Sequence, residues 1–86
     1  MEDNQICIGN KGFKSYLAAC TEQLKKTPQI EILSRGNLNS KAIHLAGCLQ
    51  DEQNHEIADI SISRRNDPDG VVSELRIVVN KAAQQT

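Results

Sequence analysis

Apolar residues alternate with other residues in two short segments of the chain, and each of these segments ends at a glycine. The first covers residues 5–8 and stops at Gly9, and the second carries Ile30 and Ile32 and stops at Gly36. A period of two residues is typical of strands, because successive side chains point to opposite faces. The pattern therefore predicts a strand in each place.

After each of these strands the apolar period becomes that of an α-helix. The spaced apolar residues are Phe13, Leu17, Cys20 and Leu24 in the first helix, and Leu38, Ala42, Leu45 (or Ala46) and Leu49 in a second helix over about 38–53. Pro28 ends the first helix, because the residue before a proline avoids the helical conformation. We expect Asn10 and Asn37 to cap the two helices, because short polar side chains accept hydrogen bonds from the free amides there.

The last third of the chain returns to alternation and predicts a hairpin. Ile60 and Ile62 precede the segment NDPDG at 66–70, and Leu75, Ile77 and Val79 follow it. Pro68 suits the second position of a type I turn, and Gly70 tolerates a left-handed bulge. The predicted element order is β-α-β-α-β-β.

This order predicts an α+β two-layer sandwich, in which one mixed four-stranded sheet carries two helices on one face. The first two strands are joined through a helix, so they form a parallel pair with a right-handed crossover. We expect a single domain over residues 5–80, a disordered N-terminus at 1–4 and a frayed tail at 81–86.

The composition predicts a small apolar core, and the cysteine content predicts a reducing compartment. The chain has 86 residues, of which 38% are hydrophobic, with no Trp, and such a core favours association with another chain. No apolar run approaches the ~20 residues of a membrane span, and the polar start MEDNQ is not a secretory signal. Three cysteines without a C-x-x-C pair predict inert thiols rather than disulfides or zinc. We expect a cytoplasmic protein, associated with the chromosome or, in a eukaryote, nuclear.

The basic residues gather at the two strand-to-helix turns. A net charge of −1 excludes a generic histone-like polycation, so the distribution of charge matters more than its sum. Lys11 and Lys14 follow the first strand, while Arg35 and Lys41 flank the second turn. Parallel neighbours place both turns at one edge of the sheet, where two helix N-termini supply free amides and partial positive charge. The arrangement predicts a phosphate-binding edge, and solvated turn residues are the alternative.

Other candidate sites have weaker support. His44 and Cys48 have i, i+4 spacing but lack further metal ligands, and His55 is expected to be an exposed charge partner of Asp51 and Glu52. No nucleophile, base and orienting group come together, so we predict a protein without catalytic residues, metal or cofactor.

Two pairs of side chains near the candidate surface, one basic and one aromatic, each have two interpretations. Consecutive Arg64 and Arg65 point to opposite faces of a strand, so one can meet a ligand while the other pairs across strands. Of the two aromatic residues Phe13 and Tyr16, at least one belongs to the core, and Phe13 is the better candidate for ligand contact.

Two segments, IGNKGFKSYLAA and IEILSRGNLNSKAIHLAG, together resemble the Alba family of small nucleic-acid-binding proteins. Gly9, Lys11 and Tyr16 match the first family motif, and Arg35, Gly36, Ser40, Lys41 and Ala42 match the second. The resemblance covers about residues 5–80. It implies a fold like the C-terminal domain of translation initiation factor 3, and a dimer that binds DNA or RNA.

The resemblance also implies site residues. The family's two basic turns contact the nucleic-acid backbone, and its terminal hairpin reaches along a groove. The candidate binding residues are therefore Lys11, Lys14, Arg35, Gly36, Asn37, Lys41, Arg64, Arg65 and Arg76. Chromatin coating is one family role, and pairing with a related chain as a scaffold subunit of a ribonuclease P-like ribonucleoprotein is the alternative to a homodimer.

This chain departs from the family pattern in ways that lower its positive charge. Asn10, Gly12 and Asn37 stand where the family often has Lys, Pro and Arg or Lys, and the hairpin tip carries Asp67 and Asp69. Fewer phosphate contacts predict a shallower salt dependence of binding. The departures favour structured RNA over dense DNA coating, because asparagine amides still donate to phosphate oxygens or base edges.

Overall fold

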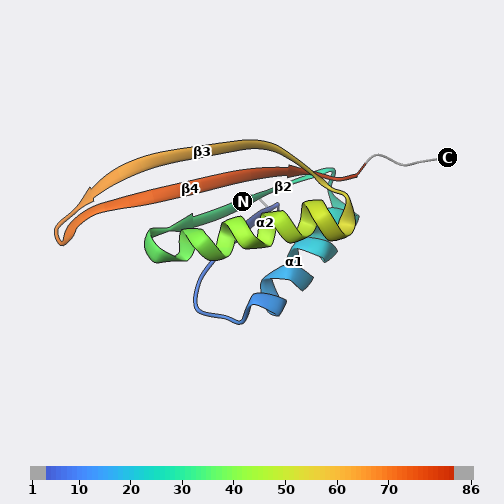
Figure 1. The fold of residues 1–86 in the computed structure, drawn as a ribbon, viewed down its shortest axis with the longest axis horizontal. Coiled ribbons are helices and arrows are strands. Elements are labelled where there is room, and N and C mark those ends of the chain that lie inside the picture. The colour runs from blue at the N-terminus through green and yellow to red at the C-terminus, as the bar shows by residue number, and fades with distance from the viewer. Residues whose placement is uncertain (1–3, 83–86) are drawn as a thin grey trace.

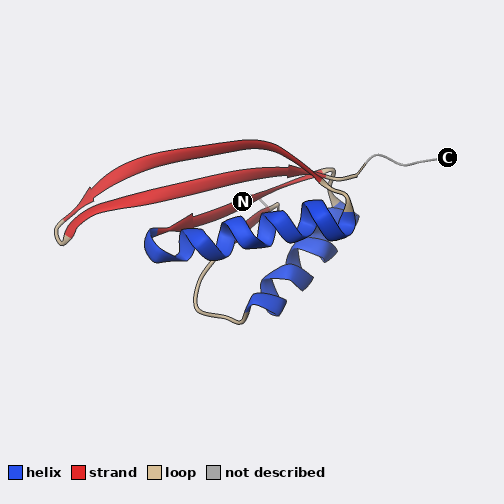
Figure 2. Cartoon of the chain, viewed as in Figure 1, coloured by secondary structure: helices blue, strands red, loops and turns tan. Residues whose placement is uncertain are grey.

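The structure is a computed structural model that describes residues 4–82, and it has the predicted element order. Both helices lie on one face of a four-stranded mixed sheet, so the predicted α+β sandwich is confirmed (Figures 1 and 2). The elements are β1 (Gln5–Cys7), α1 (Phe13–Lys26), β2 (Gln29–Arg35), a 3-10 turn (Gly36–Leu38), α2 (Asn39–Gln53), β3 (Glu56–Asp67) and β4 (Gly70–Asn80).

The strand order in the sheet is β1-β2-β4-β3, with β1 parallel to β2 and the other neighbours antiparallel. Ile32 in β2 lies opposite Ile77 in β4, and Ile77 lies opposite Ile60 in β3. Directly paired side chains share a face of the sheet. Because Ile32 and Ile77 are fully buried under the helices, Ile60 belongs to the same apolar face.

The core lies between this face and the two helices. Its buried members include Tyr16, Cys20 and Leu24 of α1, Ala42, Leu45, Ala46 and Leu49 of α2, and Ile30, Ile32, Ile77 and Val79 of the sheet. Burial raises the pKa of the Cys20 thiol to about 12, so this thiol is inert as predicted. Cys7 is not packed among apolar residues as the sequence predicted: it is exposed, because it points away from the helices on the edge strand β1.

Neither predicted asparagine cap forms. Gly12 stands at the N-cap of α1 and Leu38 at that of α2, and neither of these N-cap residues makes a side-chain cap hydrogen bond. Asn10 lies two residues too early, and the 3-10 turn places Asn37 inside helical backbone. The amides at both helix starts are therefore left without a side-chain acceptor.

The hairpin projects past the helices, which leaves part of its apolar face uncovered (Figure 1). Ile60 is 53% exposed and Ile62 is 70% exposed, although both belong to the face that is buried elsewhere in the sheet. The hairpin closes through Pro68 and Asp69, and Gly70 follows with a φ of 136°, a conformation that glycine adopts readily. The protein is elongated as a result, with extents of 52 × 27 × 24 Å.

Residues next to the expected domain limits are hydrogen-bonded to the sheet and its loops. The Asn4 carbonyl accepts from the Glu31 amide, and the Lys81 amide donates to the Pro28 carbonyl, both at 2.8 Å. The rest of the expected N-terminus and tail, residues 1–3 and 83–86, lies outside the described residues. None of the helices within residues 4–82 is long and apolar enough to cross a membrane.

His55 is a hydrogen-bond acceptor, not the exposed charge partner that the sequence predicted. Its Nδ1 accepts a hydrogen bond from the Ala82 amide at 2.9 Å. Burial, and to a lesser degree the charge of Lys81, lowers the pKa of the imidazole below its ordinary value. The folded protein therefore disfavours the charged form of His55, whose ring is hydrogen-bonded to Ala82.

This shift predicts a pH dependence of stability. Because the pKa of His55 is lower in the folded state, the unfolded state binds more protons once the pH falls below 6.5. We expect the free energy of unfolding to fall as the pH drops from 6.5 through the folded-state pKa of His55. The stabilisation that the uncharged imidazole provides is fully present above pH 6.5. Chemical denaturation over this pH range checks it against His55→Gln, which does not titrate. Parallel curves for the two proteins would contradict the prediction.

Candidate nucleic-acid interface

The two strand-to-helix turns lie beside each other, as the sequence predicted. β1 and β2 are parallel neighbours, so their carboxyl ends meet at one edge, and α1 and α2 both start there. Lys41 of α2 contacts the first turn directly, with its Nζ 3.2 Å from the carbonyl oxygens of Gly9 and Lys11. Helix N-termini carry partial positive charge, so their juxtaposition favours an anion.

The second turn depends on Gly36. Its φ is 62°, in the left-handed region, and the 3-10 turn that it starts turns the chain from β2 into α2. Asn39 stabilises the start of α2: its Oδ1 accepts from the Ser34 hydroxyl at 2.7 Å, and its Nδ2 donates to the Ser73 carbonyl at 3.3 Å. Arg35 and Asn37 are exposed on either side of Gly36.

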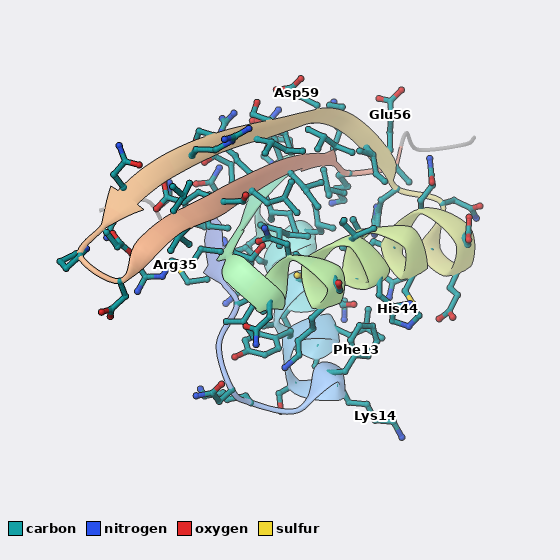
Figure 3. The ribbon with its side chains drawn as sticks, turned by 60° about the vertical axis from the view of Figure 1, so that its left-hand side comes forward. Phe13, Lys14, Arg35, His44, Glu56 and Asp59 are labelled. Atoms are coloured by element: carbon teal, nitrogen blue, oxygen red, sulfur yellow. The ribbon has the colours of Figure 1, made fainter. Side chains whose placement is uncertain are left out.

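Four cations of the predicted site are exposed and unpaired. Within residues 4–82, the side chains of Lys11, Lys14, Arg35 and Arg64 take part in no hydrogen bond or ion pair. Figure 3 shows Lys14 projecting away from the protein at the start of α1. Three of these residues lie at the two turns and Arg64 lies on the hairpin. An unpaired, hydrated cation can bind phosphate without first breaking an internal ion pair.

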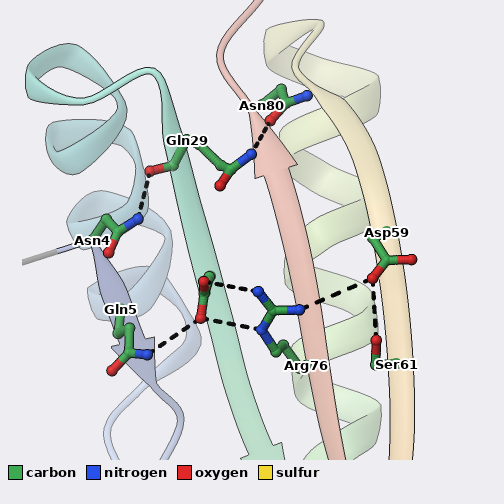
Figure 4. A network of polar contacts seen from close by, with 8 residues as sticks. Asn4, Gln5, Gln29, Asp59, Ser61, Arg76 and Asn80 are labelled. Carbon is green, nitrogen blue, oxygen red and sulfur yellow. Dashed lines mark hydrogen bonds and ion pairs between the residues drawn. The ribbon is translucent and has the colours of Figure 1, made fainter. Parts of the chain in front are cut away.

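Arg76, in contrast, is held in a polar network that crosses all four strands on the face opposite the helices (Figure 4). Its Nε and Nη2 donate to the two carboxylate oxygens of Glu31 at 3.2 and 2.9 Å, and Asp59 lies 4.0 Å from Nη1. Gln5 also donates to Glu31, at 3.2 Å. The Arg76 and Gln5 hydrogen bonds hold the pKa of Glu31 below its ordinary value. The positive charge of Arg76 is therefore largely neutralised.

Arg65 also has carboxylate partners. Its Nε lies 3.2 Å from Asp67 and its Nη1 lies 3.3 Å from Glu74 on the neighbouring strand β4. This is the cross-strand pairing expected for one of the two consecutive arginines, and Arg64 is the one left unpaired. Of the three hairpin arginines of the predicted site, one has a free guanidinium.

Both turns and the hairpin border one cleft of about 730 Å³. The first turn contributes Gly9 and Asn10, the second contributes Arg35, and the hairpin contributes residues from both β3 and β4. The free guanidinium of Arg35 therefore stands between the turns and the hairpin. The turns and the hairpin belong to one continuous concave surface.

Tyr16 holds the first strand-to-helix turn in place, a role that the sequence pattern did not reveal. Its side chain is 7% exposed, and its hydroxyl oxygen accepts from the amides of Gly9 at 2.7 Å and Lys11 at 3.2 Å. Tyr16 is thus the aromatic residue of the core, while Phe13 is half-buried. The Phe13 ring lies against His44, with 4.8 Å between ring centroids (Figure 3). Helical spacing placed Tyr16 near the core, but it did not predict the hydrogen bonds between the Tyr16 hydroxyl and the loop amides.

His44 and Cys48, which share i, i+4 spacing on α2, gain no further metal ligand within the described residues. His44 Nε2 and Cys48 Sγ are 4.0 Å apart, and no group of three His, Cys, Asp or Glu side chains suited to a metal occurs within residues 4–82. The remaining chemistry of this surface is that of free ammonium, guanidinium and amide donors, which bind anions.

Comparison with solved structures supports the fold. The crystal structure of ALBA1 from Trypanosoma brucei matches with a TM-score of 0.84 and 23% identity, over 95% of this chain and 72% of that chain. Alba from Thermoplasma volcanium matches with a TM-score of 0.76 and 24% identity, over 91% of this chain and 100% of that chain. Among curated protein sequences, none matches the chain.

The sequence itself assigns the family. The sequence profile of the Alba family matches residues 4–64, which include both strand-to-helix turns, both helices and most of β3. This range also contains every predicted site residue except Arg65 and Arg76. The chain belongs to the Alba family.

Proposed function

We propose that this protein is a non-enzymatic nucleic-acid-binding protein that contacts the phosphate backbone of DNA or RNA through a surface that we call the phosphate edge. The phosphate edge comprises Lys11, Lys14, Arg35, Gly36 and Asn37 together with the N-termini of α1 and α2. The observation that carries the proposal is the presence of three unpaired cations at two adjacent, uncapped helix starts. Both features lower the free energy of a bound phosphate.

The hairpin contributes less positive charge than its three arginines suggest. Arg65 and Arg76 are paired with carboxylates, so Arg64 is the hairpin cation available to a ligand without rearrangement. Asp69 at the tip is exposed and repels phosphate. A ligand that follows the hairpin therefore gains few contacts, which favours recognition of a compact, structured RNA over continuous coating of duplex DNA.

We expect Lys11→Ala/Arg35→Ala to weaken binding and to flatten its salt dependence. The slope of log K against log salt is negative, and on duplex DNA each lost phosphate contact makes it less steep by about 0.9. Two lost contacts therefore flatten the slope by about 1.8. Titrations of duplex DNA and of a structured RNA at several salt concentrations measure both quantities. Equal affinity and slope for the variant and the wild type would show that the phosphate edge is not the binding surface.

A charge-matched control tests whether position or net charge matters. Lys25→Ala/Lys26→Ala removes the same charge from the other end of α1, where both lysines are exposed. We expect a smaller effect on the salt slope there, because these lysines lie at the negative end of the helix. If both double variants weaken binding alike, nonspecific attraction explains the binding.

In the proposed function the protein acts as a dimer. The exposed apolar side chains of the described residues include Ile43 at 58%, Ile60 at 53% and Ile62 at 70%, and Ile60 and Ile62 belong to the helix-covered face of the sheet. We call Ile43, Ile60 and Ile62 the apolar strip. Burying the strip against a second copy removes apolar surface from water. It also adds buried apolar contacts to a domain whose own core is small. Two copies present two phosphate edges to one nucleic acid.

The second candidate function is a scaffold subunit that pairs with a related chain in a ribonucleoprotein. The exposed apolar strip favours it as well, because a related chain would cover the same side chains. Light scattering of the purified protein distinguishes the two functions. A stable homodimer that binds RNA without another protein contradicts an obligate heteromeric scaffold.

A further inference from the structure

The loop between β1 and α1 is held by two side chains from the helices behind it. The Tyr16 hydroxyl oxygen accepts hydrogen bonds from the amides of Gly9 at 2.7 Å and Lys11 at 3.2 Å. The Lys41 ammonium donates to the carbonyl oxygens of the same two residues, at 3.2 Å each. All four backbone polar groups of Gly9 and Lys11 are therefore bound by Tyr16 and Lys41.

The two anchoring side chains also contact each other. Lys41 Nζ lies 5.7 Å from the centre of the Tyr16 ring, within the range of a cation–π interaction. They come from different helices, so the loop conformation depends on the packing of α1 against α2. The close approach leaves little room, because a Cβ added at Gly9 would lie 3.2 Å from the Tyr16 oxygen.

These contacts give Lys41 a different environment from the other cations of the turns. Lys11 and Lys14 are exposed and their ammonium groups are unpaired, whereas Lys41 is half-buried and two of its three donors bind loop carbonyls. A lysine that contacted phosphate with all its donors would have to release the loop first.

From this geometry we infer that Lys41 and Tyr16 form a clamp that fixes the loop in the conformation that presents Lys11 to phosphate, so that Lys41 is a positioning residue. This inference rests on the proposed function, because it assigns roles within the phosphate edge. A loop that is already ordered loses less conformational entropy when a ligand binds. Lys41 thus strengthens binding through Lys11.

Hydrogen exchange of the free protein tests the clamp without any nucleic acid. Lys41→Met removes the ammonium and keeps the alkyl chain, and Tyr16→Phe removes the hydroxyl and keeps the ring. We expect both changes to speed exchange of the Gly9 and Lys11 amides, while the core amides of α2 stay protected. Lys14→Met is the matched control, since its ammonium is unpaired and its removal leaves these amides unchanged. Unchanged exchange in Lys41→Met would overturn the clamp.

Binding measurements separate positioning from direct contact. Tyr16→Phe removes no charge, yet its hydroxyl oxygen accepts two hydrogen bonds from the loop. We therefore expect it to weaken RNA binding by at least the roughly two- to tenfold that a single lost hydrogen bond costs. Leu24→Val, a buried change in the same helix away from the loop, controls for general destabilisation. If Tyr16→Phe binds like wild type while Lys41→Met does not, Lys41 contacts the ligand directly and the positioning role is wrong.

A double-mutant cycle gives the final comparison. If Lys41 acts through Lys11, Lys41→Met costs less affinity in a Lys11→Met background than in the wild type. Additive losses would indicate two independent phosphate ligands and contradict the inference. If the wild type binds neither DNA nor RNA, the proposed function fails, and the exchange experiment still decides whether the clamp exists.

Discussion

Replacing Ile60 and Ile62 with aspartate is expected to convert the proposed dimer to a monomer. Both side chains belong to the face that is buried elsewhere in the sheet, yet they are 53% and 70% exposed in the single chain. Burying a carboxylate without a partner costs several kcal/mol, so two of them weaken self-association by more than about a thousandfold. Light scattering over a range of concentrations measures this change.

Ser61→Asp/Ser63→Asp is the matched control for this prediction. Both serines are exposed on the same strand, they point to the opposite face, and the changes add the same charge. We expect the control to remain a dimer. The comparison uses the oligomeric state alone, because both serines line the cleft and their carboxylates would also repel RNA. A dimer that persists in Ile60→Asp/Ile62→Asp would show that the apolar strip is not the interface.

The second large effect is expected in the core beneath the site. Leu45 is fully buried in the middle of α2 and faces the sheet. Truncation of such a leucine to alanine lowers the free energy of unfolding by about 2–5 kcal/mol. Natural domains are stable by only about 5–15 kcal/mol, so Leu45→Ala removes a large share of the stability of this small domain. Urea denaturation followed by circular dichroism measures the loss.

Substitutions at two exposed positions of the same helix serve as comparisons for Leu45→Ala. Gln50→Ala is expected to change the free energy of unfolding by no more than about 0.5 kcal/mol, because Gln50 is exposed and makes no packed contact to lose. Ile43→Ala is expected to destabilise the protein in a concentration-dependent way, since its side chain belongs to the apolar strip. A loss for Leu45→Ala as small as that for Gln50→Ala would mean that α2 is not packed on the sheet as the structure shows.

Much of the fold follows from local sequence patterns. Alternation at Ile30 and Ile32, helical spacing at Cys20 and Leu24, and the hairpin turn around Pro68 each depend on side chains close together in the chain. These patterns predicted the elements, and a helix between the first two strands predicted their parallel pairing. The two cap predictions failed for a local reason: α1 starts after an extended Gly12, two residues beyond Asn10, and the 3-10 turn that begins at Gly36 places Asn37 inside helical backbone.

The candidate site was predictable in position but less so in detail. The sequence placed both basic turns at one edge of the sheet, because β1 and β2 are parallel neighbours. It did not predict that Arg76 would find Glu31, a residue 45 positions away, or that Lys41 would bind the Lys11 carbonyl 30 positions away. The exposure of Cys7 and the acceptor role of His55 were missed for the same reason, since both depend on distant segments.

The sequence by itself determined the elements, their order, the family and the edge where the cations gather, because these depend on periodicity and on motifs written along the chain. Only the tertiary structure decided which cations remain free. Among residues 4–82, Lys11, Lys14, Arg35 and Arg64 have unpaired side chains, whereas Arg65 and Arg76 have carboxylates and Lys41 has carbonyl oxygens within 4.0 Å. Strand register and helix packing bring such partners into contact, and a charge is available to a ligand only where they do not.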